Sequence, residues 1–203
     1  MVFEGGHGSG KTTQAKLLIN SLHRAGHKCV YTQEPFSAIL KPAIAFYSKK
    51  DTAHPIVLAL LVAADRYAHL EQIVDFLRRG FVVVCDRYYP SSWVYQTIHG
   101  VPLRFIHFIN QHAPQPDLLF IIETPLRTRL RRSVGRRKSS HNHIFLTPKL
   151  LREEQRLYSV VTGQLRHQPF VRVLNGQKKR KELSDEVSSI TTSLLDSRRI
   201  RRR

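Results

Sequence analysis

Short apolar runs, separated by longer amphipathic stretches, dominate the pattern of hydrophobic and polar positions along the chain. The run "FVVVCDRY" (81–88) opens with almost continuous apolar, β-branched residues, which is typical of a strand buried on both faces of a parallel sheet. The same reasoning predicts further strands over residues 1–4, 28–32, 117–124 and 170–176. Five buried strands are therefore expected.

Helical spacing of apolar residues fills the stretches between these strands. In "KTTQAKLLINSLHRAG" (11–26) Ala15, Leu18 and Leu22 fall on one helical face, and Gly26 ends the segment. Longer helices are expected over residues 55–79 and 183–199. Strands that alternate with helices predict an α/β fold with a parallel sheet, and residues 1–203 are expected to form a single domain because no linker or repeat interrupts them.

Composition narrows the class of protein. The chain has 203 residues, 41% of them hydrophobic, and it contains no apolar run of about 18 residues, so no membrane span is expected. The first residues also lack the layout of a signal peptide. Cys29 and Cys85 each lie within an apolar run and are expected to be buried free thiols. These features favour a cytoplasmic protein.

The net charge of +18 indicates an affinity for polyanions such as nucleotides or nucleic acids. The basic residues are clustered, with no acid between Glu123 and Glu153 and a terminal run "RRIRRR" (198–203). A terminal run of this kind is typical of a solvated tail, here residues 197–203. Contact of the tail with nucleic acid is the less favoured interpretation.

The segment "GGHGSGKTT" (5–13) follows the first predicted strand and opens the first predicted helix. Gly5-x-x-x-x-Gly10-Lys11-Thr12 matches the P-loop, in which glycines turn backbone N–H groups toward phosphate oxygens and the helix adds its positive end. Lysine reaches the β- and γ-phosphates, and the threonine hydroxyl is a ligand of Mg²⁺. The sequence therefore predicts ATP binding by Gly5, Gly6, His7, Gly8, Ser9, Gly10, Lys11, Thr12 and Thr13.

A second group of polar residues is expected at the carboxyl edge of the same sheet, where ligands bind in open α/β folds. Asp86 and Arg87 follow the third strand, as a metal-site carboxylate and a phosphate-binding guanidinium. Arg66, on the long helix, and Glu34, after the second strand, are expected to face the same cleft. A structural salt bridge explains either residue of the Asp-Arg pair alone, but explains both less well beside a P-loop strand.

The acid-free basic stretch is expected to act as a lid. Residues 133–147 are assigned to it. The side chains in and beside it that would donate hydrogen bonds to phosphate are Arg132, Arg136 and Arg137. Closing such a lid would neutralise charge and exclude water during phosphoryl transfer. Several of these arginines are expected to face solvent only, and Arg136 and Arg137 are the candidates for catalysis.

The segments "FEGGHGSGKTTQ", "QEP", "AADRYAH", "DRYYPSSWVYQ" and "PDLLFIIETP" resemble, in order and spacing, the thymidylate kinase family. The resemblance runs from Phe3 to about Asn175. It implies a P-loop NTPase fold with five parallel strands, helices on both faces, and a homodimer. It also implies Mg²⁺-dependent transfer of a phosphoryl group from ATP to dTMP.

The resemblance also implies roles for single residues. Lys11 and Thr12 would serve ATP and Mg²⁺, Asp86 would be the metal-site carboxylate, and Arg66 and Arg87 would hold the acceptor's monophosphate. The remaining residues implied to bind the acceptor are Glu34, Pro35, Ser92, Tyr95 and Gln96.

Several residues depart from the family pattern around the acceptor. His7 stands where the family usually has an acid near the sugar, and Val62 stands where a phenylalanine commonly stacks on thymine. Losing that stack would weaken base binding by about 1–3 kcal/mol. Phe36 could restore some stacking, and Trp93 replaces a small residue beside the pocket. These departures leave open which base the acceptor nucleotide carries.

Three functions remain after this comparison. A thymidylate kinase is the leading hypothesis. A kinase for another nucleoside monophosphate, or for several, would explain Val62 and His7. A P-loop protein that binds nucleotide without catalysis is the third, and the joint presence of Lys11, Asp86 and Arg66 counts against it.

Overall fold

The structure is a computed structural model that describes residues 1–48, 54–134 and 147–200. The strands within these ranges are β1 (Val2–Glu4), β2 (Cys29–Gln33), β3 (Val82–Asp86), β4 (Leu119–Glu123) and β5 (Val171–Asn175). The helices are α1 (Lys11–Arg24), α2 (Leu40–Tyr47), α3 (Pro55–Arg78), α4 (Tyr89–Ile98), α5 (Leu103–Ile109), α6 (Leu126–Val134), α7 (Pro148–Leu165) and α8 (Arg180–Ile200). All five predicted strands are confirmed, with ends that differ by at most two residues.

The strands form one parallel sheet in the order β2-β3-β1-β4-β5, which confirms the predicted α/β class. Phe3 and Gln33 both pair with Asp86, the last residue of β3. The loops that follow β1, β2 and β3 therefore leave the sheet together at its carboxyl edge. This register brings the P-loop to the same place as the segments after Gln33 and Asp86.

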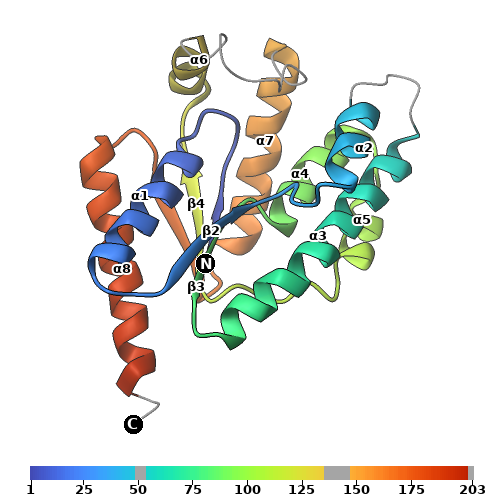
Figure 1. Ribbon diagram of the computed structural model, residues 1–203. Coiled ribbons are helices and arrows are strands. Elements are labelled where there is room, and N and C mark those ends of the chain that lie inside the picture. The colour runs from blue at the N-terminus through green and yellow to red at the C-terminus, as the bar shows by residue number, and fades with distance from the viewer. Residues whose placement is uncertain (49–53, 135–146, 201–203) are drawn as a thin grey trace.

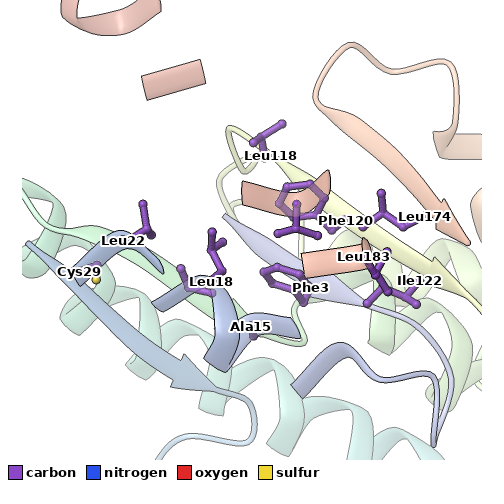
Figure 2. Close-up of a cluster of buried hydrophobic side chains, with 12 residues drawn as sticks. Phe3, Ala15, Leu18, Leu22, Cys29, Leu118, Phe120, Ile122, Leu174 and Leu183 are labelled. Atoms are coloured by element: carbon purple, nitrogen blue, oxygen red, sulfur yellow. The ribbon is translucent and has the colours of Figure 1, made fainter. Parts of the chain in front are cut away.

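Alternate residues of each strand point to opposite faces of the sheet. One face buries Phe3, Phe120 and Ile122 against α1 and α8, and Figure 2 shows their side chains beside Ala15, Leu18 and Leu183. The other face buries Val2, Leu119 and Ile121 against α4 and α7. Figure 1 shows α1 and α8 side by side on one side of the sheet, and α2 to α5 on the other. Both faces are covered, as the near-continuous apolar strands predict.

The ends of α3 and α7 follow from local sequence. His54 caps α3 by accepting a hydrogen bond from the backbone N–H of Ile56, Pro55 begins the helix, and Gly80 follows it with φ 80°. Thr147 caps α7 in the same way, and Pro148 takes its first position. α7 therefore begins directly after residues 135–146.

Two segments predicted from sequence lie partly outside the described residues. Only residues 133, 134 and 147 of the predicted lid belong to the described ranges, at the end of α6 and the cap of α7. α8 continues through Ile200, so residues 197–200 of the predicted tail are helical, and residues 201–203 lie outside the described ranges. In the part of the chain that the structure describes, none of the helices is long and apolar enough to cross a membrane.

Candidate active site

The P-loop connects β1 to α1 through backbone conformations that favour glycine. Gly5, Gly8 and Gly10 have φ angles of 140°, 78° and 104°, all in the left-handed region. α1 begins at Lys11, so the N–H groups of its first turn open toward the loop. A Cβ atom at Gly6 would lie 2.5 Å from the guanidinium carbon of Arg129. The loop therefore has the form of an anion-binding nest.

Lys11 is buried at the first position of α1 and lines the cavity beside the loop. Burial lowers the pKa of its ammonium group to about 7, and the positive charge of Arg87 acts in the same direction. Asp86 and Glu4 oppose that shift but do not cancel it. An arriving phosphate would supply the missing negative charge, so Lys11 would take up a proton as phosphate binds.

Thr12 and Asp86 meet where α1 faces the end of β3. The Thr12 hydroxyl donates a hydrogen bond to Oδ2 of Asp86, and the Tyr31 hydroxyl lies 3.3 Å from the same oxygen. The other carboxylate oxygen, Oδ1, is buried and has no hydrogen-bond partner among the described residues. A hydroxyl and a carboxylate with one unsatisfied oxygen are hard oxygen ligands of the kind that Mg²⁺ uses beside phosphates. The two residues therefore fit a magnesium ion.

Arg66 lies on α3 with 1% of its surface exposed, and it is held by two partners. Its Nε and Nη2 donate to the Glu34 carboxylate, with the shortest contact at 2.7 Å, and Nη1 donates to Oδ1 of Asn110. These bonds use one N–H of each nitrogen in a guanidinium that carries five N–H donors. One N–H on each terminal nitrogen remains, and Arg66 lines the cavity.

Arg87 follows β3 with a φ of 76°, the one positive value among the described non-glycine residues. Its Nη1 donates to the hydroxyls of Ser91 and Tyr158, at 3.1 and 3.3 Å, and its guanidinium lies 4.9 Å from the centre of the Tyr95 ring. These contacts hold the guanidinium beside the cavity, which Arg87 also lines.

Glu4, the last residue of β1, is fully buried and anchors the start of α4. Its Oε1 accepts hydrogen bonds from the backbone N–H groups of Tyr88 and Ser91, at 2.8 and 3.1 Å. Its Oε2 accepts from the hydroxyls of Ser91 and Tyr158. Burial raises the pKa of the carboxyl, while Arg87 and these hydrogen bonds oppose the rise. One side chain thus joins the strand before the P-loop to the helix that carries Ser92, Tyr95 and Gln96.

A cavity of about 780 Å³ opens between the P-loop, α3 and α4. Most of the residues that the sequence assigned to the acceptor, the metal and catalysis line it together. They are His7, Lys11, Thr12, Glu34, Pro35, Val62, Arg66, Asp86, Arg87, Ser92, Tyr95 and Gln96. Gly8 also lines it, and Gly5, Gly6, Ser9, Gly10 and Thr13 complete the adjoining loop and the first turn of α1.

The residues expected in the lid are placed only in part. Arg132, on α6, donates to the backbone oxygens of Ser9 and Gly176, at 3.3 and 2.8 Å, so it lies against the P-loop. Arg136 and Arg137 lie outside the described residues. Their predicted role in catalysis therefore stays a prediction.

Two aromatic residues do not lie where their sequence positions suggested. Phe36 does not line the cavity, because its ring stacks on His69 with the ring centres 4.4 Å apart. Trp93 also lies away from the cavity and packs against Tyr89 and His107. The expectations that Phe36 could restore a stack and that Trp93 borders the pocket are therefore wrong. Val62 does line the cavity.

Sequence reasoning missed several polar residues of the site. Glu4 was assigned only to an apolar strand, and Glu154 and Tyr158 lie on the buried face of α7 between Leu151 and Val161. A carboxylate on the apolar face of an amphipathic helix is a readable signal, because a buried charge needs a partner. The partner of Glu154 is Arg129 on α6. No pattern in the sequence pointed to that pair.

Comparison with known proteins agrees with this geometry. The family model described as thymidylate kinase matches residues 3–181. The probable thymidylate kinase of Methanococcus aeolicus is 34% identical over 190 residues, which is 92% of each protein. That of Pyrococcus abyssi is 38% identical over 143 residues, 67% of this chain and 70% of the relative. That of Thermococcus kodakarensis is 29% identical over 96% of this chain and 98% of the relative. The chain belongs to the thymidylate kinase family.

Proposed function

We propose that the protein is a thymidylate kinase, which transfers the γ-phosphoryl group of ATP to dTMP and releases ADP and dTDP. The observation that carries this proposal is that the P-loop lysine, the buried Arg66 and the half-buried Arg87 line one and the same cavity. Lys11 suits the phosphates of the donor, and Arg66 and Arg87 suit the phosphate of the acceptor. Membership of the family supports the same reaction.

Charge neutralisation is the main contribution of these side chains. In the transfer, an oxygen of the acceptor's phosphate forms a bond to the γ-phosphorus while the bond from that phosphorus to ADP breaks. Lys11 and the P-loop N–H groups would stabilise the negative charge that gathers on the donor. Arg66 and Arg87 would hold the acceptor phosphate in line, and both are already fixed by neighbouring side chains. Such preorganised charges lower the barrier without reorganising during the reaction.

Thr12 and Asp86 would hold Mg²⁺ at the end of β3. When bound, the ion would supply positive charge that offsets the negative charge of the phosphates. The Thr12 hydroxyl donates its hydrogen to Asp86, so the lone pairs of its oxygen remain available to the ion. The unpaired Oδ1 of Asp86 supports this assignment.

The acceptor's base would lie along α4. Oγ of Ser92 and Oε1 of Gln96 are buried in the cavity wall and have no hydrogen-bond partner among the described residues. They lie four residues apart on one helical face, so a single planar base could contact both. Tyr95 would pack beside the sugar, and Glu34, Pro35 and His7 would complete the acceptor site.

The lid is proposed to complete the site from the other side. Arg132 already lies against the P-loop and would serve ATP. Arg136 and Arg137 would supply catalytic charge when residues 133–147 cover the phosphates. Their separate contributions can be tested by single replacement with methionine.

A wider choice of acceptor is the second candidate function. Val62 and Leu58 form an apolar wall of the cavity, and the Phe36 ring lies outside it. Aliphatic side chains offer no hydrogen bond that would select one base, and they would hold a base less strongly than a stacked aromatic ring does. This apolar wall is compatible with a kinase that accepts several deoxynucleoside monophosphates.

An ADP-release assay with Mg-ATP separates these functions. The acceptors are dTMP, dUMP, dCMP, dAMP, dGMP and UMP, each tested at matched concentrations. Preference for dTMP is expected. Comparable kcat/KM values for several acceptors would replace the proposal by the second candidate. No turnover of any acceptor by folded protein that still binds ATP would leave only nucleotide binding.

The assembly and compartment are proposed on separate grounds. α3 exposes apolar side chains in one stripe, Val57, Leu60, Ala64 and Ala68, and we infer that a second copy of the chain covers it in a homodimer. Light scattering of Leu60→Glu should then show a monomer.

Cys29 and Cys85 are buried free thiols, as expected, and they support a place in the cytoplasm.

A further inference from the structure

A buried ion pair connects the two helices on either side of residues 135–146. Arg129 on α6 and Glu154 on α7 contact each other through Nη2 and Oε2, and their side chains are only 3% and 2% exposed. Neither residue belongs to the P-loop or to the groups assigned to the acceptor's phosphate. Burying such a pair removes two charges from water, and the attraction between them rarely does more than offset that penalty. Stability alone therefore explains the pair poorly.

Both members of the pair bind the backbone of the same P-loop residue. Arg129 Nε donates to the carbonyl oxygen of His7 at 2.8 Å, and Glu154 Oε1 accepts from the N–H of His7 at 2.9 Å. The guanidinium also lies on Gly6, where a Cβ would be 2.5 Å away, and the backbone oxygen of Arg129 lies over Gly8. The middle of the loop is thus held through both the N–H and the carbonyl group of one residue, His7.

The same carboxylate reaches the acceptor side of the cavity. The Tyr95 hydroxyl donates to Glu154 Oε1 at 2.6 Å, and both residues line the cavity. The ring of Tyr95 in turn lies 4.9 Å from the guanidinium of Arg87. Glu154 therefore connects the P-loop to the helix that carries Ser92 and Gln96, through one oxygen atom that accepts two hydrogen bonds.

We propose that Arg129 and Glu154 are positioning residues, which hold the P-loop at His7 and the Tyr95 ring in one fixed arrangement so that donor and acceptor are aligned. The effect on the acceptor rests on the proposed function. The effect on the P-loop does not, because it can be measured as nucleotide affinity without turnover.

The test compares a single variant, a double variant and a matched control. Glu154→Gln keeps the size of the side chain but removes its charge and leaves Arg129 buried without a counterion. The double variant Arg129→Met/Glu154→Leu removes both charges, so it should be more stable than Glu154→Gln, although the hydrogen bonds to His7 and Tyr95 are lost. Glu153→Gln is the control, because it breaks the exposed Arg156–Glu153 pair one position away on the same helix.

Positioning predicts that stability and kinetics separate in the double variant. Its melting temperature should lie above that of Glu154→Gln, while the Kd for ADP and the KM for dTMP both rise and kcat/KM falls about 10- to 100-fold. Glu154→Gln should show the same kinetic loss together with a lower melting temperature. Glu153→Gln should change neither quantity.

Recovery of wild-type ADP affinity and kinetics in the stable double variant would overturn the proposal, because the pair would then serve folding alone. If the double variant does not fold, Glu154→Gln decides, and an unchanged Kd for ADP with an unchanged KM for dTMP overturns the proposal. If the wild type does not turn over dTMP, the proposed function fails. Calorimetry of ADP binding then still tests the effect on the loop.

Discussion

The Glu34 carboxylate accepts three hydrogen-bond contacts from the guanidinium of Arg66, and both side chains are buried. The contacts fix the plane of the guanidinium, and Asn110 holds its third nitrogen. Arg66 thus faces the cavity in one orientation before any ligand arrives. The acceptor phosphate would meet a preorganised cation, and not a flexible one.

Replacement of Glu34 by glutamine tests this arrangement. The variant leaves the buried charge of Arg66 without its counterion, so the free energy of unfolding should fall by about 3 kcal/mol or more. The KM for dTMP should rise about 10- to 100-fold, since a charge-assisted hydrogen bond is misplaced, while the KM for ATP stays nearly unchanged. Steady-state kinetics and denaturant unfolding measure the two effects.

The control for Glu34→Gln is Asp75→Asn, which breaks the exposed pair between Asp75 and Arg79 on α3. Exposed pairs of this kind contribute about 1 kcal/mol or less, so stability and kinetics should barely change. Equal effects of the two substitutions would contradict the role given to Glu34.

The lowered pKa of Lys11 predicts that nucleotide binding takes up a proton. At pH 8 most of the ligand-free protein carries a neutral Lys11, because the pKa is about 7, and bound phosphate favours the charged form. Affinity for ADP should therefore fall as the pH rises from 7 to 9. Calorimetry at pH 8 in buffers of different ionisation enthalpy should show the uptake, and Lys11→Met should abolish it.

The same pKa gives a stability prediction with a defined sign. In the unfolded chain Lys11 keeps its proton up to about pH 10.5, whereas in the ligand-free fold it loses it near pH 7. The unfolded state then binds more protons between these values, so this residue's contribution to stability rises with pH. Lys11→Met should stabilise the ligand-free protein more at pH 7 than at pH 10. An equal gain at the two pH values would show that Lys11 stays charged in the fold.

Asp86→Asn should separate activity from stability. The buried Oδ1 atom of Asp86 has no hydrogen-bond partner among the described residues, so removing the charge should leave the melting temperature of the ligand-free protein unchanged or raise it. The variant should lose about 100-fold or more in kcat and need a higher Mg²⁺ concentration, since a ligand of the ion is weakened. A titration of rate against Mg²⁺ at saturating ATP and dTMP measures this. An unchanged Mg²⁺ requirement would place the metal elsewhere.

Val62→Phe tests the base end of the cavity. A ring at this position on α3 should lower the KM for dTMP by roughly 5- to 150-fold, the range expected for base–aromatic stacking of about 1–3 kcal/mol. Leu77→Phe, on an exposed position of the same helix, is the control and should have no effect. If Val62→Phe raises the KM, the ring blocks the base and does not stack on it.

The strands and the P-loop were predictable because their signals are local. A buried parallel strand is a short apolar run, and the glycines of the P-loop stand at fixed spacing before Lys11 and Thr12. The parallel register then brings the carboxyl ends of β1, β2 and β3 together without further information. The position of Asp86 near Thr12 follows from the strand alone, because Asp86 and Val84 share the face that α1 covers.

Side-chain partners across long separations were not predictable in this way. Arg129 and Glu154 belong to different helices, and each is a common surface residue when read alone. The sequence does not show which ring Phe36 would stack on. The packing of α3 places His69 against it. Trp93 lies on α4 one residue after Ser92, and a rotation of about 100° per residue turns it away from the cavity. Such outcomes depend on how whole elements pack.

The buried side chain of Glu4 also affects the distance between the P-loop and α4. The side chain joins the residue that precedes the P-loop to the N–H groups of Tyr88 and Ser91. β1 leads into the P-loop, and α4 would carry the acceptor. The distance between them therefore depends on the two methylene groups of the Glu4 side chain. Aspartate, one methylene shorter, would reach these N–H groups only if the strand and the helix moved closer together. The length of this one side chain therefore helps to set the distance between the donor and the acceptor nucleotide.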